Sequence, residues 1–186
     1  ITVNPNGTLL VSDSSATATN HRLGARAVTT AGGLITLIGN PNSGQNTAET
    51  TGVWTFNAGQ SVITVDADGT AGSTTLTLSS TVATRNAGAT ALFRGDSLGN
   101  AAAAGVSVIT GGAAAGGLLF VGQAGALNAV NKGIAPWALV DTSVSGTGIS
   151  FATSDGTATT GTGRLRALNA TEYVTTLGAF SGTTNN

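Results

Sequence analysis

Residues 53–78 read VWTFNAGQSVITVDADGTAGSTTLTL. Three short runs rich in β-branched and aromatic residues lie within this stretch, at 53–56, 61–65 and 74–78. Between two of them stands Asp66-Ala67-Asp68-Gly69, in which Gly can adopt a positive φ and Asp can bond its own backbone. In the last run Leu76 and Leu78 alternate with threonines, which is the two-residue period of a half-buried strand. The stretch therefore predicts short β-strands joined by tight turns.

The same pattern continues in both directions along the chain. Further predicted strands lie at 8–12, 34–38, 90–94, 106–110, 117–121, 137–140 and 149–153, with weaker ones at 164–168 and 173–177. Strand centres recur roughly every 8 to 16 residues, a rhythm shared by β-sandwiches, β-barrels and β-solenoids. The spacing indicates an all-β protein without choosing among these three.

The composition excludes a helical bundle and limits how the surface is solvated. Of 186 residues, 28 are Gly and only 8% are charged, whereas an ordinary soluble domain carries about 25% charged residues. The strong helix formers are scarce, while Gly and Thr are poor ones. Hydrophobic residues make up 40% of the chain, enough for a core, so Thr, Ser and Asn must supply the polar surface.

We predict a right-handed parallel β-helix, or a closely related β-solenoid, formed by residues 1–186 as one segment; a β-sandwich is the alternative. Thr and Asn stack well in ladders of parallel strands, and they would line the outside while Val, Ile and Leu fill a continuous interior. Neither end carries an atypical capping repeat, so we expect a fragment or processed piece of a much longer protein. With three strands per coil, the chain would supply on the order of eight coils.

Charge and cysteine content exclude several classes of partner. The net charge is −1 and the seven basic residues are spread along the chain, whereas nucleic-acid binding needs clustered Lys and Arg. There is no Cys, so disulfides and thiolate chemistry are excluded. Residues 97–131 carry no charge, but they are mostly Ala and Gly and are interrupted by polar residues such as Ser107 and Gln123. We therefore expect neither nucleic-acid binding nor a membrane span.

No group of residues predicts catalysis, a cofactor or a metal site. His21 is the sole histidine and stands beside Arg22 in a predicted turn, without a nucleophile and acid that can be singled out to join it. Asp66 and Asp68 resemble the start of a calcium loop, but the rest of that pattern is missing, so an Asp-rich turn is the better interpretation. The chain is predicted not to be an enzyme, and no catalytic, cofactor-binding or metal-binding residue is assigned.

Two other features have competing interpretations. Arg94-Gly95-Asp96 spells an integrin-type tripeptide, which we interpret as a strand end running into a turn. Carbohydrate-active β-helices use paired carboxylates and aromatic platforms, whereas aromatic residues are 4% of this chain. Trp54 and Trp137 lie in apolar runs and are predicted to be core or stacking residues.

Several phrases, in order, resemble bacterial proteins with autotransporter-associated β-strand repeats. The first is Thr19-Asn20-His21-Arg22-Leu23-Gly24 followed by the β-rich 31–39. Later phrases of the same kind lie at 84–95, 133–138, 150–153, 166–168 and 171–173. The chain departs from the family where Gly39-Asn40 runs into Pro41, because the usual Gly-Thr-rich repeat core with its aromatic ending is missing.

The resemblance implies a long, exported, β-helical passenger at the cell surface or in extracellular matrix, with no catalytic residues. The predicted function is accordingly a non-catalytic structural or adhesin-type segment. Two alternatives remain open: a filament subunit that stacks end to end through open β-edges, and a carbohydrate-active β-helix. The expected partners are the chain itself, adjacent coils of the parent protein and surface polysaccharide.

Overall fold

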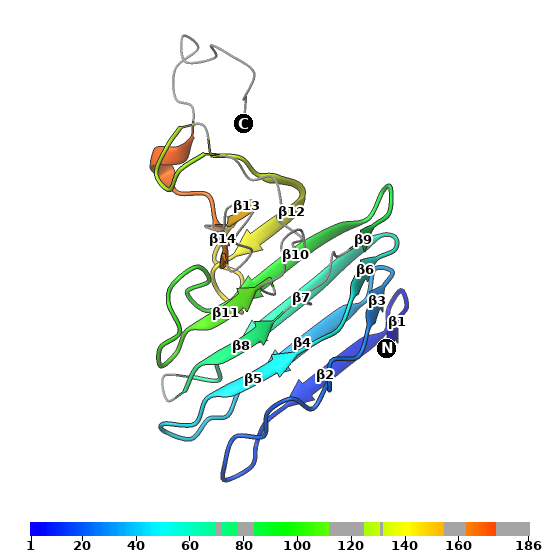
Figure 1. The fold of residues 1–186 in the computed structure, drawn as a ribbon, viewed down its shortest axis with the longest axis vertical. Helices are drawn as coiled ribbons and strands as arrows, with labels where there is room; N and C mark the ends of the chain where they lie inside the picture. The colour runs from blue at the N-terminus through cyan, green and yellow to red at the C-terminus, as the bar shows by residue number, and fades with distance from the viewer. Residues whose placement is uncertain (70–71, 78–83, 112–124, 131, 155–162, 174–186) are drawn as a thin grey trace.

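The fold is a β-solenoid of about three turns, seen as parallel stacked coils in Figure 1. The computed structural model describes residues 1–69, 72–77, 84–111, 125–130, 132–154 and 163–173. Within these ranges the only helical element is the 3-10 turn η1 (Ala170–Glu172). No helix in the described ranges has the length and apolarity needed to cross a membrane.

Three sheets form the walls of the solenoid. The first contains β1 (Thr2–Val3), β3 (Val28–Thr30), β6 (Trp54–Phe56) and β9 (Thr84–Arg85). The second contains β2 (Thr8–Ser12), β4 (Leu34–Ile38), β7 (Gln60–Asp66), β10 (Thr90–Gly95), β12 (Ala135–Asp141), β13 (Ile149–Ser154) and β14 (Leu165–Ala167). The third contains β5 (Thr47–Thr50), β8 (Thr74–Thr77) and β11 (Ser107–Thr110). Each full coil contributes one strand to each wall.

The coils are longer than the sequence suggested, so the prediction of about eight coils is wrong. Leu34 of β4 lies beside Val62 of β7, and Gln60 of β7 lies beside Thr90 of β10, so one coil takes 28 residues and the next takes 30. Loops between the walls, such as residues 39–46, use many of these residues. The chain after β12 also leaves the parallel stack, which removes further residues from it.

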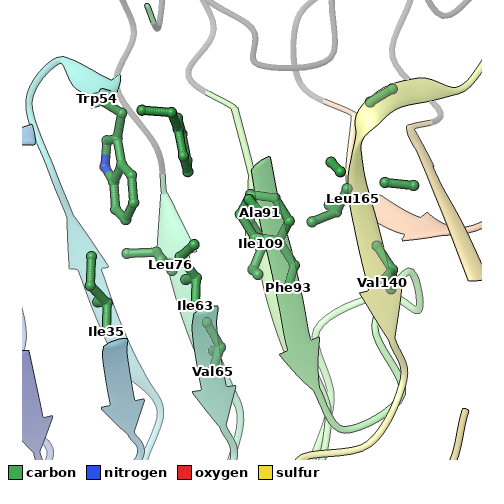
Figure 2. Packing of buried hydrophobic residues seen from close by; sticks show 14 of the residues in the cluster. Ile35, Trp54, Ile63, Val65, Leu76, Ala91, Phe93, Ile109, Val140 and Leu165 are labelled. Carbon is green, nitrogen blue, oxygen red and sulfur yellow. The ribbon is translucent and has the colours of Figure 1, made fainter. Parts of the chain in front are cut away.

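Apolar side chains from successive coils form continuous columns inside the solenoid, as predicted. The parallel registers place Ile35, Ile63, Phe93 and Val140 in one line across the second sheet, and all four are buried. Figure 2 shows these side chains filling the space between the walls. In-register stacking repeats the same packing at each rung, and burial of this apolar surface is the main stabilising contribution.

The interior also holds hydroxyl groups, which were expected only on the outside. Thr47, Thr74 and Ser107 are in register across the third sheet and are all buried. At the opposite corner Thr30 Oγ1 and Ser61 Oγ lie 2.8 Å apart in a buried hydrogen bond. A buried hydroxyl costs little when it is hydrogen-bonded, as Thr47 Oγ1 is to Asp13 Oδ2, whereas Thr74 Oγ1 is buried without a hydrogen-bond partner among the described residues.

After β12 the second sheet continues through two antiparallel pairings. β12 pairs parallel with β10, but β13 then pairs antiparallel with β12, and β14 antiparallel with β13. Arg164 forms an antiparallel bridge with Thr110 of the third sheet, and Leu165 joins the interior cluster. In the described residues β13 and β14 therefore continue the second sheet beyond β12, and β14 is its last strand.

Most strands with large apolar residues were predicted, and those without them were missed. The predictions at 8–12 and 34–38 match β2 and β4, and the other described predictions fall within one or two residues of a strand. β3, β5 and β9 were not predicted, because VTT, TAET and TR show no apolar alternation and are fixed by pairing with neighbouring coils. The prediction at 117–121, and all but the first residue of the prediction at 173–177, lie outside the described residues.

Two successive coils approach each other closely at Gly72, and a substitution there tests this contact. A Cβ built there would lie 1.8 Å from the backbone oxygen of Gln45 in the preceding coil. Gly72→Ala should therefore lower the free energy of unfolding by more than about 2 kcal/mol, because the backbone must move. Gly44→Ala is the matched control: its Cβ meets open space, so it should lose only the roughly 1 kcal/mol of a left-handed residue. Equal losses in urea unfolding would contradict the close approach.

Candidate functional site

The N-terminal end of the second sheet presents an unpaired strand edge. Leu34 N donates to Gly7 O at 2.9 Å and Asp13 N donates to Ile38 O at 3.0 Å. Alternate residues of a strand direct their backbone groups to the same neighbour, so Thr8, Leu10 and Ser12 of β2 direct theirs away from β4. The Leu10 side chain, on the outer face, is 58% exposed. β2 is therefore an open edge with an apolar side chain beside it.

An irregular segment, rather than a strand, completes the first coil on the third wall. His21 N donates to Ala48 O at 3.0 Å and Ala25 N donates to Thr50 O at 3.2 Å. Between them Leu23 N donates to Glu49 Oε2 at 2.9 Å. The segment thus covers the edge of β5. The open strand edges at this end of the solenoid belong to the first two walls.

Arg22 links this segment to the open edge. Its Nε donates to Oε1 of the buried Glu49 at 3.0 Å, and its Nη1 donates to the carbonyl oxygen of Ser12 at 2.5 Å. Glu49 needs these partners because a buried carboxylate without them would be strongly destabilising. Sequence reasoning missed this pair. The sequence carries one sign of it. Glu49 occupies the inward position that the apolar residues Leu76 and Ile109 occupy on the neighbouring strands.

A second buried carboxylate, Asp13, organises the corner after β2. Oδ1 accepts hydrogen bonds from Ser15 Oγ at 2.7 Å and Asn40 Nδ2 at 3.2 Å, and Oδ2 accepts from Thr19 N at 2.9 Å and Thr47 Oγ1 at 2.8 Å. Burial alone would raise the pKa of Asp13. The hydrogen bonds from Ser15, Thr19 and Thr47 outweigh burial and hold this pKa well below its ordinary value. Asp13 is therefore a structural anchor that joins the first coil to the second.

The far end of the stack holds a buried ion pair. Arg166 Nη1 donates to Glu172 Oε2 and Nη2 donates to Glu172 Oε1, each at 2.7 Å. Asn128 N and Asn169 N donate to the same carboxylate, both at 2.8 Å. Burial acts to raise the pKa of Glu172, but the Arg166 hydrogen bond and the two backbone donors lower it to about 2. This pair fixes the chain after β14 against the 125–130 segment.

Asp13 and Glu172 make the free energy of unfolding depend on pH in the acid range. The pKa values of Asp13 and Glu172 are lower in the folded chain than their ordinary values of 3.8 and 4.5. A carboxyl with a depressed folded pKa stabilises fully above its unfolded pKa and loses that contribution as the pH falls through the folded value. The free energy of unfolding should therefore be flat from neutral pH to about pH 5 and then fall steeply towards about pH 2.

Urea unfolding across this pH range checks the prediction, with Asp13→Asn as the control variant. At neutral pH this variant should lose about 1–3 kcal/mol, because the new amide N–H₂ faces donors. Its acid slope should be shallower than that of the wild type, because one of the two groups no longer titrates. An unchanged slope would contradict the assignment to Asp13.

The residues considered from sequence for chemistry are not brought together. His21 is exposed and lies at the corner of the first coil, while Asp66 and Asp68 lie after β7. Asp66 Oδ1 accepts a hydrogen bond from Asp68 N at 2.7 Å, which confirms the Asp-rich turn. In the part of the chain that the structure describes, no group of three His, Cys, Asp or Glu residues is arranged to hold a metal.

The integrin-type tripeptide is built into a sheet rather than displayed on a loop. Arg94 and Gly95 belong to β10, and a Cβ at Gly95 would lie 2.8 Å from Val65 O of the preceding coil. Arg94 Nε lies 4.0 Å from Oδ2 of the buried Asp141. Partial burial raises the pKa of Asp96, with Val144 N opposing this shift and the charge of Asp66 adding to it. The tripeptide is thus a strand end, as interpreted from sequence.

Both tryptophans are confirmed as stacking residues. The rings of Trp54 and Phe56 stack at 5.5 Å between centroids, and Trp137 lies 5.2 Å from Phe56 and 6.5 Å from Phe93. Arg85 lies over Trp137, with its guanidinium carbon 5.9 Å from the ring centroid. These aromatic contacts join the first and second walls, so neither Trp54 nor Trp137 forms an exposed sugar-binding platform.

One described cavity, of about 370 Å³, lies beside β14. Its polar lining comes from Asn100, Thr142, Arg164, Arg166 and Asn169, and its apolar lining includes Leu98 and Leu127. Arg164 is held there by a 3.0 Å hydrogen bond from its Nε to Gly99 O. None of the described residues that line the cavity is a carboxylate, whereas glycoside hydrolysis uses a pair of them.

Comparison of the chain with protein-family models, curated proteins and solved structures finds no match.

Proposed function

We propose that this chain is a non-catalytic structural segment of a long bacterial surface or matrix protein, of the kind that carries autotransporter-associated β-strand repeats. The observation that carries the proposal is the continuous parallel stack, in which buried columns such as Ile35–Ile63–Phe93–Val140 pass through successive coils. Such a stack resists bending because every rung is tied to the next by backbone hydrogen bonds and side-chain packing. Its use is to hold other parts of a protein apart.

The roles of the buried carboxylates support a structural rather than a chemical function. Asp13, Glu49 and Glu172 each accept hydrogen bonds from backbone or basic groups of another coil or loop. Asp141 is also buried, and its Oδ1 accepts from Ser143 N at 3.1 Å and Thr147 N at 3.3 Å. Carboxylates saturated in this way stabilise loops and are poorly placed to act as acids or bases.

The composition supports an extracellular location. A chain without Cys that is only 8% charged suits export and an environment where Thr, Asn and Gly supply the wetted surface. Adjacent coils of a parent protein and surface polysaccharide are the partners we propose for it. No feature of the described residues favours the carbohydrate-active alternative.

The open β2 edge favours a second candidate, association between chains. An unpaired strand edge invites another strand. At the other end of this sheet β13 runs antiparallel to the stack, and β14, the last described strand, pairs antiparallel with β13 and so runs in the direction of the stack. This second candidate is therefore end-to-end stacking of chains through open β-edges.

Two measurements test the proposed function. Antibodies raised against the chain should label intact, unpermeabilised cells of the source bacterium or their surrounding matrix. The purified chain should release no reducing ends or unsaturated products from a panel of bacterial and plant polysaccharides. Labelling only after permeabilisation would contradict the location, and sugar release would contradict the non-catalytic role.

A further inference from the structure

Four separate parts of the chain line the cavity of about 370 Å³. They are residues 98–101 after β10, Leu127 in the 125–130 segment, Thr142 after β12, and residues between positions 164 and 169 around β14. Leu98 is buried, whereas Asn100 and Leu127 are exposed. The cavity is therefore a pocket with a buried floor and an exposed mouth. Pockets that bind small ligands span about 300–1,000 Å³, so this one has the size of a small-molecule site.

The pocket wall is held by a close contact between the loop after β10 and strand β14. Gly99 has a φ of +104°, and a Cβ built there would lie 2.4 Å from Cβ of Arg166. Only glycine lets the loop lie this close to β14. The contact places the carbonyl oxygen of Gly99 3.0 Å from Nε of Arg164, which donates a hydrogen bond to it. The position of the Arg164 side chain is therefore fixed by the backbone of a neighbouring segment.

Arg164 lines the pocket with a positive charge that the described residues do not neutralise. Its Nε donates to Gly99 O, but no described residue accepts a hydrogen bond from Nη1 or Nη2, and no described carboxylate pairs with it. Arg166 differs, because both of its Nη atoms donate to Glu172. A guanidinium with a fixed Nε presents its two Nη atoms as a planar fork that fits a carboxylate. The pocket therefore favours an anionic ligand over a neutral or cationic one.

We propose that the pocket binds a uronic acid residue of an acidic surface polysaccharide, with the sugar carboxylate on Arg164. The inference deepens the proposed function and rests on it, because it names the chemistry of the polysaccharide partner. The two carboxylate oxygens accept hydrogen bonds from Nη1 and Nη2 of Arg164, and the two opposite charges balance each other. A neutral sugar in the same place leaves the guanidinium without an opposite charge, so it binds more weakly.

The other lining residues suit a sugar ring better than a bare anion. Asn100 and Thr142 carry hydrogen-bond donors and acceptors for ring hydroxyls. Leu98, Leu127 and Ala167 supply apolar surface for the C–H groups of the ring. A bare anion such as phosphate makes no use of this apolar surface. The described lining holds no carboxylate, so an acidic sugar meets no like charge there and no pair of acids that could cleave it.

Titration of the full chain with short uronic acid oligosaccharides tests the ligand class. The panel contains oligomers of galacturonate, glucuronate and mannuronate, each with its methyl-esterified counterpart as the matched neutral ligand. Calorimetry should find binding of at least one acidic oligomer, with its ester at least about tenfold weaker, because the ester loses the charge-assisted hydrogen bonds. No binding of any oligomer, or equal affinity for acid and ester, would overturn the proposal. Displacement by an equal concentration of acetate or inorganic phosphate would show a general anion site and overturn the assignment to a sugar.

Arg164→Gln should weaken binding of the acidic oligomer about tenfold or more and leave the affinity for its ester unchanged. Arg26→Gln is the matched control. It removes the same charge from an exposed arginine of the first coil, whose Nη1 donates to Leu23 O at 3.0 Å. This variant should bind like the wild type. Equal losses in the two variants would mean that binding follows net charge rather than the pocket.

Substitutions of Leu127 make the test independent of folding. Leu127 is 55% exposed at the pocket mouth, so a charged side chain there does not disturb the core. Leu127→Lys should strengthen and Leu127→Glu should weaken binding of the acidic oligomer, each about two- to fivefold. Changes in the same direction, or no change, would contradict a carboxylate in the pocket. Loss of binding leaves the cell-labelling and sugar-release results unaffected, so failure of this proposal is distinguishable from failure of the proposed function.

Discussion

Phe93→Ala should lower the free energy of unfolding by about 3–5 kcal/mol, the range expected when a fully buried aromatic side chain is removed. Phe93 is 0% exposed and lies in the middle of the longest interior column, between Ile63 and Val140. Its ring also contacts two aromatics, with centroids 6.2 Å from Phe56 and 6.5 Å from Trp137. Removing it leaves a cavity that the rigid stacked walls cannot close.

Urea unfolding followed by far-ultraviolet circular dichroism measures this loss. Phe93→Leu should recover about half of it, because most of the volume returns without the aromatic contacts. Leu34→Ala is the matched surface control. Leu34 is 46% exposed on the outer face of the same sheet and should change stability by no more than about 0.5–1 kcal/mol. Similar losses at positions 93 and 34 would mean that the column is not the core.

Glu172→Gln should cost about 3–5 kcal/mol, because it leaves the Arg166 guanidinium buried without its opposite charge. The substitution keeps the shape of the side chain, so the loss reports charge rather than packing. The wild-type carboxylate also accepts bonds from Asn128 N and Asn169 N. The amide replaces one of these acceptor oxygens with a donor, which adds an unfavourable contact.

A double-mutant cycle separates the pair from its surroundings. Arg166→Leu with Glu172→Leu should be less destabilising than the sum of the two single substitutions, because neither charge is then left unpaired. The coupling should also disappear below about pH 2, where Glu172 protonates. Additive losses at neutral pH would contradict a coupled ion pair.

The sequence predicted those parts of the fold that are encoded by local pattern. TTLTL and SVITV alternate visibly, and the inward positions Leu76, Ile63 and Val65 are buried as expected. Strand direction and the length of a coil are set by pairing between residues nearly thirty positions apart, such as Leu34 with Val62. No local pattern carries that pairing when the chain has no sharp internal repeat. The number of coils was accordingly overestimated.

The buried polar residues were harder to predict because their structural roles depend on partners that lie far away in the sequence. Asp13 is an ordinary turn residue in sequence, and only Asn40 and Thr47 of the next coil make it a buried anchor. Arg166 and Glu172 are close in sequence, but nothing local shows that their environment is buried. Arg22 was noticed beside His21, whereas its partner Glu49 lies a full coil away.

Paired cysteines on neighbouring strands are the most direct test of parallel, in-register stacking of the coils. Thr36 lies beside Thr64 across β4 and β7, while Gln60 is displaced by four residues along the same strand. Neighbouring strands lie about 4.8 Å apart, within disulfide range. We expect peptide mass spectrometry to find an intramolecular disulfide in the variant with Thr36→Cys and Thr64→Cys, and none in the variant with Thr36→Cys and Gln60→Cys. No bond in the first pair, or equal bonding in both, would contradict the parallel stack.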